Sequence, residues 1–146
     1  MKKILLNKDY GCFDVSLEAT LEYAKRKHLK VSIYKAHYHK GKDVTYSLVS
    51  YKTLRDNNSK SLFGYVLATK NYGRVTQFIP QNDRLDLDET YREDTTLIEI
   101  VEEMGPKASG KFGCLKVVEI PDELVGNYMI DNYDGIERLH QKVQEW

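Results

Sequence analysis

The chain has 146 residues, of which 41% are hydrophobic and 30% charged, with three prolines and nine glycines. This composition is typical of a soluble globular protein and excludes collagen-like, low-complexity and disulfide-rich classes. The length suffices to bury a core without metal or disulfide support, so we expect residues 1–146 to form a single domain.

The N-terminus and the cysteines give expectations about the compartment. The apolar run Ile4–Leu6 is too short for a signal peptide or a membrane span. Cys12 and Cys114 are too few and too far apart for a disulfide framework, so we expect free thiols. These features predict a cytoplasmic protein with no membrane partner.

The net charge is zero, but the charges are unevenly distributed. Residues 1–80 contain 15 Lys and Arg against 6 Asp and Glu, whereas residues 81–146 contain 7 against 16. The two halves either neutralise each other by packing together or form separate faces, suited to different partners or to head-to-tail self-association. Neutralisation within the molecule is the simpler expectation.

The first half of the chain predicts one helix among strands. A short strand is expected at Lys3–Leu6, and Ser16 is a suitable N-cap for a helix that runs to about His28. Alternation predicts a strand over Val31–Tyr38, and further strands are expected at Val44–Thr53, Leu62–Ala68 and Val75–Ile79. We expect these four strands to form an antiparallel meander.

The second half starts with an acidic, polar segment, Pro80–Glu93, that predicts an exposed loop. Asp94 or Thr95 then caps a helix that ends at Gly105-Pro106, and Leu115–Ile120 predicts a central strand. A short edge strand at Tyr128–Ile130 precedes a turn at Asp134-Gly135. The stripe of Ile136, Leu139, Val143 and Trp146 then predicts a last helix, with Trp146 docked on the body.

These elements predict an α+β fold with a mostly antiparallel sheet of about five to six strands, on which about three helices pack.

Motifs that would indicate catalysis or metal binding have simpler explanations. Gly105–Lys111 has the spacing of a phosphate-binding loop, but a helix precedes it and Phe112 replaces the hydroxyl residue. His37 and His39 share a strand face without further ligands, and the acidic residues of 83–89 lack the pattern of a calcium loop.

Candidate catalytic groups are also isolated. Cys12 has no recognisable base, and Asp131 and Asp134 lie in turn-forming sequence. We therefore expect no catalytic residues, no metal and no cofactor, and a protein that is not an enzyme.

One segment has the composition of a binding surface. Between Lys30 and Arg74 the chain has nine Lys and Arg, two acidic residues and six of its eleven tyrosines. Such residues on one sheet face can stack bases and neutralise phosphates, although tyrosine and lysine are also ordinary strand residues. The candidate ligand-binding residues are Tyr34, Lys35, Tyr38, Lys40, Tyr46, Tyr51, Lys52, Arg55, Tyr65, Tyr72 and Arg74.

Three stretches carry a family resemblance: YGCFDVS, LIEIVEEMGPKASGKFGCLKVVEIPD and YMIDNYDGIERLHQKVQEW. Together they resemble small uncharacterised proteins of bacteriophages and prophages with a YGGFxLS-like start and a VVEIPD, YDG and closing W pattern. Cys12 departs from that pattern, which prefers glycine, and the central tyrosine-rich segment has no counterpart in it. The resemblance implies a phage context, hence the host cytoplasm, and no particular activity.

From these features we expect a phage-type accessory protein that binds a host or viral protein without catalysis, in host takeover or counter-defence. The alternative is a nucleotide or single-stranded nucleic-acid binder that sequesters a small nucleotide signal through the basic, tyrosine-rich sheet face. Self-association into a homo-oligomer is compatible with either function.

Overall fold

The structure is a computed structural model that describes residues 2–41, 43–52 and 64–141. Within these residues there are two α-helices and eight strands, and all paired strands are antiparallel. The helices are α1 (Leu17–Arg26) and α3 (Thr95–Met104). The strands are β1 (Lys2–Asn7), β2 (Ser32–Tyr38), β3 (Val44–Val49), β4 (Tyr65–Ala68), β5 (Val75–Thr76), β6 (Leu115–Ile120), β7 (Tyr128–Tyr133) and β8 (Ile136–Gln141). Short 3-10 turns are η1 (Gln81–Asp83), η2 (Glu89–Tyr91), η3 (Gly105–Ala108) and η4 (Asp122–Leu124).

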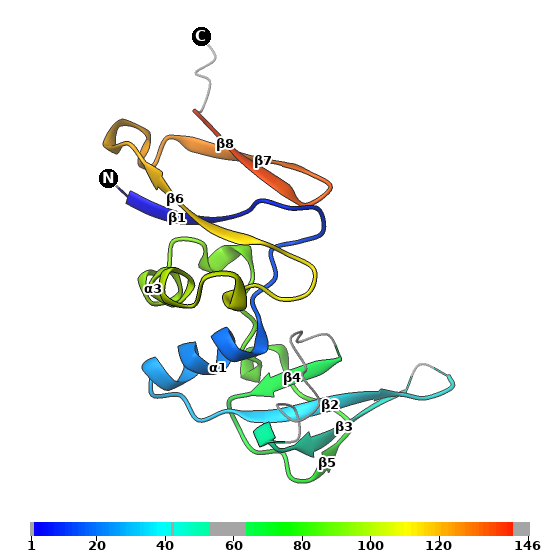
Figure 1. Cartoon of the computed structure of the whole chain (residues 1–146). Coiled ribbons are helices and arrows are strands. Elements are labelled where there is room, and N and C mark those ends of the chain that lie inside the picture. Colours follow the sequence, from blue (N-terminus) through cyan, green and yellow to red (C-terminus); the bar gives the residue numbers. More distant parts are fainter. Residues whose placement is uncertain (1, 42, 53–63, 142–146) are drawn as a thin grey trace.

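Strands β1 and β6 form the middle layer of the molecule. Leu5 belongs to the same buried cluster as the apolar residues of α1 and α3, whereas Ile4 and Leu6 belong to a cluster with β7 and β8. This division follows from the alternation of side chains along a strand. Figure 1 shows the hairpin β7–β8 on one side of β1 and β6 and the two helices on the other side.

Both helices begin where the sequence predicts, and α3 also ends as predicted before Gly105, whereas α1 ends at Arg26, two residues before the predicted end at about His28. The side chain of Ser16 accepts a hydrogen bond from the Ala19 N–H, and that of Asp94 accepts one from Leu97, so each helix has a capped N-terminus. Gly105 ends α3 with a φ of 62°, a conformation that glycine adopts without strain.

The four middle strands form one sheet, but the predicted meander is wrong. The strand order is β4-β2-β3-β5, so β4 pairs with β2 and not with its predecessor β3. Alternation predicts that a segment is a strand with two faces, and it does not specify which neighbour the strand takes. Here Ile33 of β2 lies between Val49 of β3 and Leu67 of β4. The three apolar side chains pack together in the cluster that also contains residues of α1.

The predicted exposed loop over Pro80–Glu93 is also wrong. Leu85 and Leu87 are buried in the main core, and the Leu85 N–H donates to the Leu67 carbonyl oxygen at 2.8 Å. Two apolar residues spaced two apart are enough to anchor the segment along β4, although the acidic residues around them dominate its composition.

The last predicted helix is a strand as far as the structure describes it. Asp134 and Gly135 have φ values of 48° and 93°, the combination of a type I′ turn that joins two antiparallel strands. Strand β7 accordingly extends beyond the predicted Tyr128–Ile130 to Tyr133, and β8 covers Ile136–Gln141. Trp146 lies outside the described residues.

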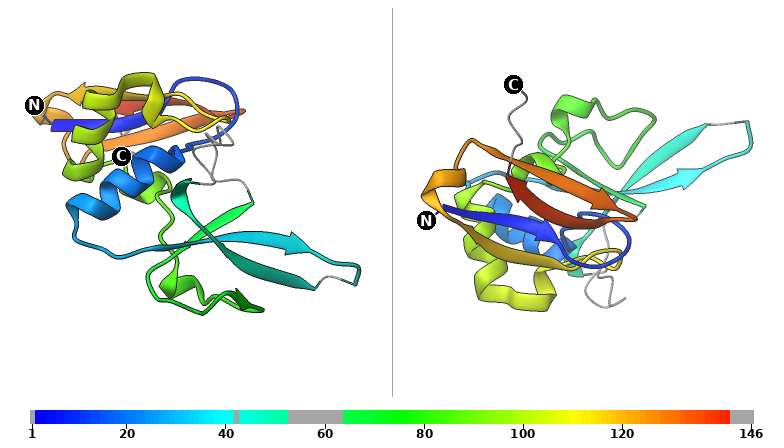
Figure 2. Two further views of the ribbon diagram at one scale, coloured as in Figure 1. Left: turned by 60° about the horizontal axis from the view of Figure 1, so that its bottom comes forward. Right: turned by 90° about the horizontal axis from the view of Figure 1, so that it is seen from above.

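The α+β class and the antiparallel pairing are confirmed. The prediction of one sheet with about three helices is corrected to three sheets and two helices in the described part of the chain. Seen from above, the hairpin lies across β1 and β6 (Figure 2).

Candidate functional site

The four-stranded sheet separates the predicted site residues onto two faces. We call the inner face the one that carries Ile33, Val49 and Leu67, which pack in the cluster with α1. The outer face carries Tyr34, Ala36, Tyr38, Val44, Tyr46, Leu48, Val66, Ala68 and Thr76. Lys35 and Tyr65 pair with each other on the inner face, so the sheet does not bring all the predicted tyrosines and lysines together.

Three tyrosines at the outer face are used within the protein. Tyr34 is completely buried; its hydroxyl donates to the Gly73 carbonyl oxygen at 2.9 Å and accepts from the Tyr72 N–H at 2.8 Å. The Tyr72 hydroxyl donates to the Asp83 carboxylate, and this hydrogen bond raises the pKa of Tyr72 to about 12. The Arg84 guanidinium lies 5.6 Å from the centre of the Tyr46 ring. These contacts hold the segment 72–84 over the sheet.

Beyond these internal contacts, large apolar side chains are exposed on the outer face and just after β5. Tyr38 is 77% exposed at the end of β2, and Leu48 is 41% exposed on β3. Phe78, which follows β5, is 69% exposed, and its backbone N–H and carbonyl oxygen both contact the Thr76 hydroxyl. Figure 1 shows that β2 and β3 project away from the helices at this end of the molecule. We call Tyr38, Leu48 and Phe78 the outer apolar residues.

The remaining predicted site residues lie around the sheet, and Tyr65 lines a cavity of about 190 Å³ together with residues of β4 and of the segment 81–86. Lys35, Lys40 and Arg74 are exposed, as are Tyr51 and Lys52 after β3. Arg55 lies outside the described residues.

His37 and His39, whose spacing alone would suit a metal pair, are hydrogen-bonded to hydroxyls of β3. The Nε2 atoms of His37 and His39 lie 2.6 Å from Ser47 Oγ and 2.8 Å from Thr45 Oγ1. Across the described ranges, no group of three or more His, Cys, Asp or Glu side chains is placed to hold a metal ion. The two histidines and the two hydroxyl groups form exposed hydrogen-bonded pairs on β2 and β3 and in the residue after β2.

The charges of the two halves neutralise each other only in part. Lys2 contacts Glu93 and Lys3 contacts Glu102, each at 2.9 Å, and Arg26 contacts Glu103. The four strands of the sheet, by contrast, contain no Asp or Glu. No described carboxylate lies within ion-pair distance of Lys35, Lys40 or Arg74. Lys35, Lys40 and Arg74 consequently keep their positive charges, while Asp43 in the β2–β3 connection and Asp83, which pairs with Lys70, are the nearby carboxylates in the chain.

The phosphate-loop spacing at Gly105–Lys111 is occupied by the protein's own carboxylate. The backbone N–H of Phe112 donates to Asp14 Oδ2 at 3.1 Å. At Gly110, a Cβ atom would lie 2.2 Å from the same oxygen, so glycine is needed for this close approach. Asp14 thus occupies the space where an anion would have to bind.

The Cys12 thiol shows no sign of activation. Partial burial raises its pKa, and the carboxylates of Asp14 and Glu89 raise it further. A reactive cysteine needs the opposite shift, toward the thiolate.

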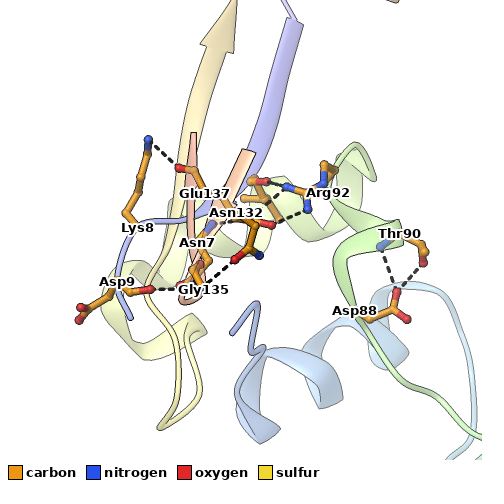
Figure 3. Close-up of polar contacts among 10 residues, drawn as sticks. Asn7, Lys8, Asp9, Asp88, Thr90, Arg92, Asn132, Gly135 and Glu137 are labelled. Atoms are coloured by element: carbon orange, nitrogen blue, oxygen red, sulfur yellow. Dashed lines mark hydrogen bonds and ion pairs between the residues drawn. The ribbon is translucent and has the colours of Figure 1, made fainter. Parts of the chain in front are cut away.

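A buried polar network that the sequence did not indicate joins the C-terminal hairpin to β1 (Figure 3). Arg92 and Glu137 form an ion pair at 2.8 Å with side chains only 13% and 5% exposed. Glu137 also accepts from the Asn7 N–H at 2.8 Å, and Arg92 donates to the Leu5 carbonyl oxygen at 2.9 Å.

The amide side chain of Asn7 extends the network. It donates to the carbonyl oxygens of Asp9 and Gly135 and accepts from the Cys114 N–H. In the described chain every buried side-chain nitrogen and oxygen has a hydrogen-bond partner, and this network holds the hairpin against β1. The sequence analysis missed this network because it predicted a helix from Ile136 to Trp146. In the observed strand β8, the side chain of Glu137 is buried.

No described helix is long and apolar enough to cross a lipid bilayer. Comparisons of the chain with protein-family models, with curated proteins and with solved structures gave no match.

Proposed function

We propose that the protein acts without catalysis, by binding an acidic surface of a protein partner through the outer face of the four-stranded sheet. One observation carries this proposal: Tyr38 at the end of β2 is 77% exposed, and Phe78, two residues after β5, is 69% exposed, and the four strands of this sheet contain no carboxylate. Exposed aromatic residues beside positive charge are typical of protein-interaction surfaces.

The residues around the outer apolar residues fit such a partner. Lys40 comes two residues after Tyr38, and the Arg74 carbonyl oxygen accepts a hydrogen bond from the Leu48 N–H at 2.8 Å, so the backbones of both basic residues lie close to those of outer apolar residues. Apolar contacts would supply most of the binding energy, and the cations would attract an acidic partner and orient it.

The phage context that the YGCFDVS and VVEIPD stretches imply supplies the biological part of the proposal. We infer a host or viral protein as the partner, in the host cytoplasm, with host takeover or counter-defence as the outcome of binding.

The alternative function, nucleotide or single-stranded nucleic-acid binding, has less support. Base stacking needs free aromatic faces, and Tyr34, Tyr46 and Tyr72 are buried or engaged within the protein. Of the outer-face tyrosines, Tyr38 alone has a largely exposed ring.

A capture experiment with matched variants tests the proposal. Tagged protein is incubated with bacterial extract, and Tyr38→Ala with Phe78→Ala is compared with Leu29→Ala with Val125→Ala, which removes two exposed apolar side chains elsewhere. We expect the first variant to lose a stoichiometric partner at least about tenfold and the control to retain it.

Two results would count against the proposal. One is the absence of any stoichiometric partner of the wild-type protein. The other is a salt-dependent affinity for oligonucleotides, or a thermal shift with nucleotides, that disappears in the Tyr38 and Phe78 variant; this would favour the alternative function.

A further inference from the structure

The turn between β7 and β8 is locked against the loop that follows β1. The Gly11 N–H donates to the Asp134 carbonyl oxygen at 2.9 Å, and the side chain of Asn132 accepts from the Gly135 N–H at 2.9 Å. A Cβ atom at Gly135 would lie 2.1 Å from the Gly11 carbonyl oxygen, so the two backbones are in direct contact. Tyr10 and Tyr133, which flank these contacts, are therefore carried by a rigid support.

The face of the hairpin that points away from β1 exposes these tyrosines. Strand alternation places Met129, Asp131 and Tyr133 of β7 on this face, opposite His140, Arg138 and Ile136 of β8. We call Tyr10, Met129, Asp131, Tyr133, Ile136 and Arg138 the hairpin patch. Tyr10 is 65% exposed, Met129 50% and Tyr133 73%. Tyrosine, methionine and arginine are the residue types enriched in the centre of protein interfaces.

The hairpin patch is also hollowed. A cavity of about 400 Å³ is lined by Tyr10, Asp131, Tyr133, Ile136 and Arg138. It is open to solvent, has aromatic and aliphatic walls and carries one charge of each sign. An aromatic side chain with a polar tip, such as tyrosine, matches these walls.

The charges of the hairpin patch complement themselves. Asp131 lies directly opposite Arg138 in the strand register, and the Asp131 carboxylate contacts His140 at 3.6 Å. Arg138 has no carboxylate within ion-pair distance among the described residues. A twofold rotation would bring Arg138 of one copy to Asp131 of another. The net charge of zero adds no repulsion between copies.

We propose that the hairpin patch is a self-docking surface through which two copies of this chain form a twofold-symmetric dimer. In this dimer, Tyr133 of each copy enters the cavity of the other, and Asp131 and Arg138 form two equivalent ion pairs across the axis. The contact is isologous, so it closes at two copies and does not extend into a fibre.

The position of the hairpin patch gives the dimer a consequence for binding. Figure 1 shows the hairpin and the four-stranded sheet at opposite ends of the molecule. A dimer joined through the hairpins presents both sheets outward, where each can contact a partner. A partner with two or more binding sites would then be held by avidity. The dimer itself does not depend on the proposed function of the sheet.

Sedimentation velocity across a concentration series tests the dimer, with charge reversal at the patch. We expect the wild-type protein to dimerise, and Asp131→Arg and Arg138→Asp each to raise the dissociation constant at least about tenfold. An equimolar mixture of the two variants should form a heterodimer, and the double variant D131R/R138D should again form a homodimer. Tyr133→Ala should weaken the dimer without altering charge.

The controls separate the dimer from folding and from the sheet. Each variant is first shown to keep the wild-type circular dichroism spectrum, and K35E/K40E/R74E, altered only at the sheet, should dimerise like the wild-type protein. A wild-type chain that stays monomeric up to roughly millimolar concentration overturns the proposal. So does a dimer that neither charge reversal nor Tyr133→Ala weakens.

Discussion

The ion pair between Arg92 and Glu137 is a buried contact between single side chains that joins the β7–β8 hairpin to the rest of the fold. Both side chains are almost fully buried, and each makes further hydrogen bonds to the backbone of β1. Removing one partner of a buried pair leaves the other charge without compensation, which costs more than the pair itself contributes. The pair therefore fixes the position of the β7–β8 hairpin relative to β1.

Replacement of Glu137 by glutamine should destabilise the protein by about 3–5 kcal/mol, because the Arg92 charge would remain buried without a carboxylate. The free energy of unfolding from urea titration measures the loss. Glu102→Gln is the matched control: its ion pair with Lys3 has side chains 40% and 43% exposed, so solvent screens the charges and the loss should be small. Equal losses in the two variants would contradict this account.

Tyr23 links stability to pH at the alkaline end. Burial, followed by the hydrogen bond to Asp94, raises its pKa from the ordinary value of 10.0 to about 12. The folded state thus favours the neutral phenol, and this stabilisation is complete below pH 10 and is lost as the pH rises from 10 to 12.

We expect the urea midpoint to fall between pH 10 and 12, and to fall less steeply in Tyr23→Phe, which has no hydroxyl to ionise. An identical pH dependence in the two proteins would show that Tyr23 does not carry the effect. Measurements at pH 7 give the separate cost of losing the hydrogen bond to Asp94.

At the scale of elements, the β7–β8 hairpin decides how the molecule closes. Its turn has two residues with positive φ and touches the Gly11 backbone. Gly135→Ala should therefore cost at least about 2 kcal/mol more than Gly41→Ala. Gly41 is a suitable control because its φ of 88° is similar to the 93° of Gly135, but nothing lies within 4 Å of its Cβ position. If the unfolding free energies of Gly135→Ala and Gly41→Ala agree within the experimental error, Gly135 does not pack closely against the Gly11 backbone.

The same hairpin shows what sequence reasoning could reach. Capping residues and apolar spacing located α1 and α3 correctly, because these signals are local. The spacing of Ile136 and Leu139 is compatible with a helix and also with a strand. The Asp-Gly pair before them was the only local sign of a hairpin. The choice depends on burying Glu137 against Arg92, 45 positions away in the chain.

The candidate site was predictable in composition and not in arrangement. The alternation over Val31–Tyr38 correctly predicted a strand, and in β2 Tyr34, Ala36 and Tyr38 lie on one face and Ile33 on the other. The alternation did not reveal that the segment 72–84 packs over that face. There the Tyr72 N–H contacts the Tyr34 hydroxyl, and the Arg84 guanidinium lies over the Tyr46 ring. Phe78 was not among the predicted site residues, since its exposure depends on this return.

For the molecule as a whole, the uneven charge has two fates. Near the helices, cations of the first half pair with carboxylates of α3 and the segment before it. The four-stranded sheet lies at the end of the molecule opposite the β7–β8 hairpin (Figure 1). Its strands contain no carboxylate, and cations and exposed aromatic side chains lie in and next to them. Our account of function rests on this second region.

The most direct test compares two triple charge reversals in quantitative capture from bacterial extract. K35E/K40E/R74E alters the sheet end, and K107E/K111E/K116E makes the same change in net charge in η3, in the loop after it and in β6. We predict that the sheet variant loses the partner at about 50 mM salt, that the control retains it, and that wild-type capture weakens at about 300 mM salt. Equal capture by the two variants would contradict the proposal that the sheet binds an acidic partner.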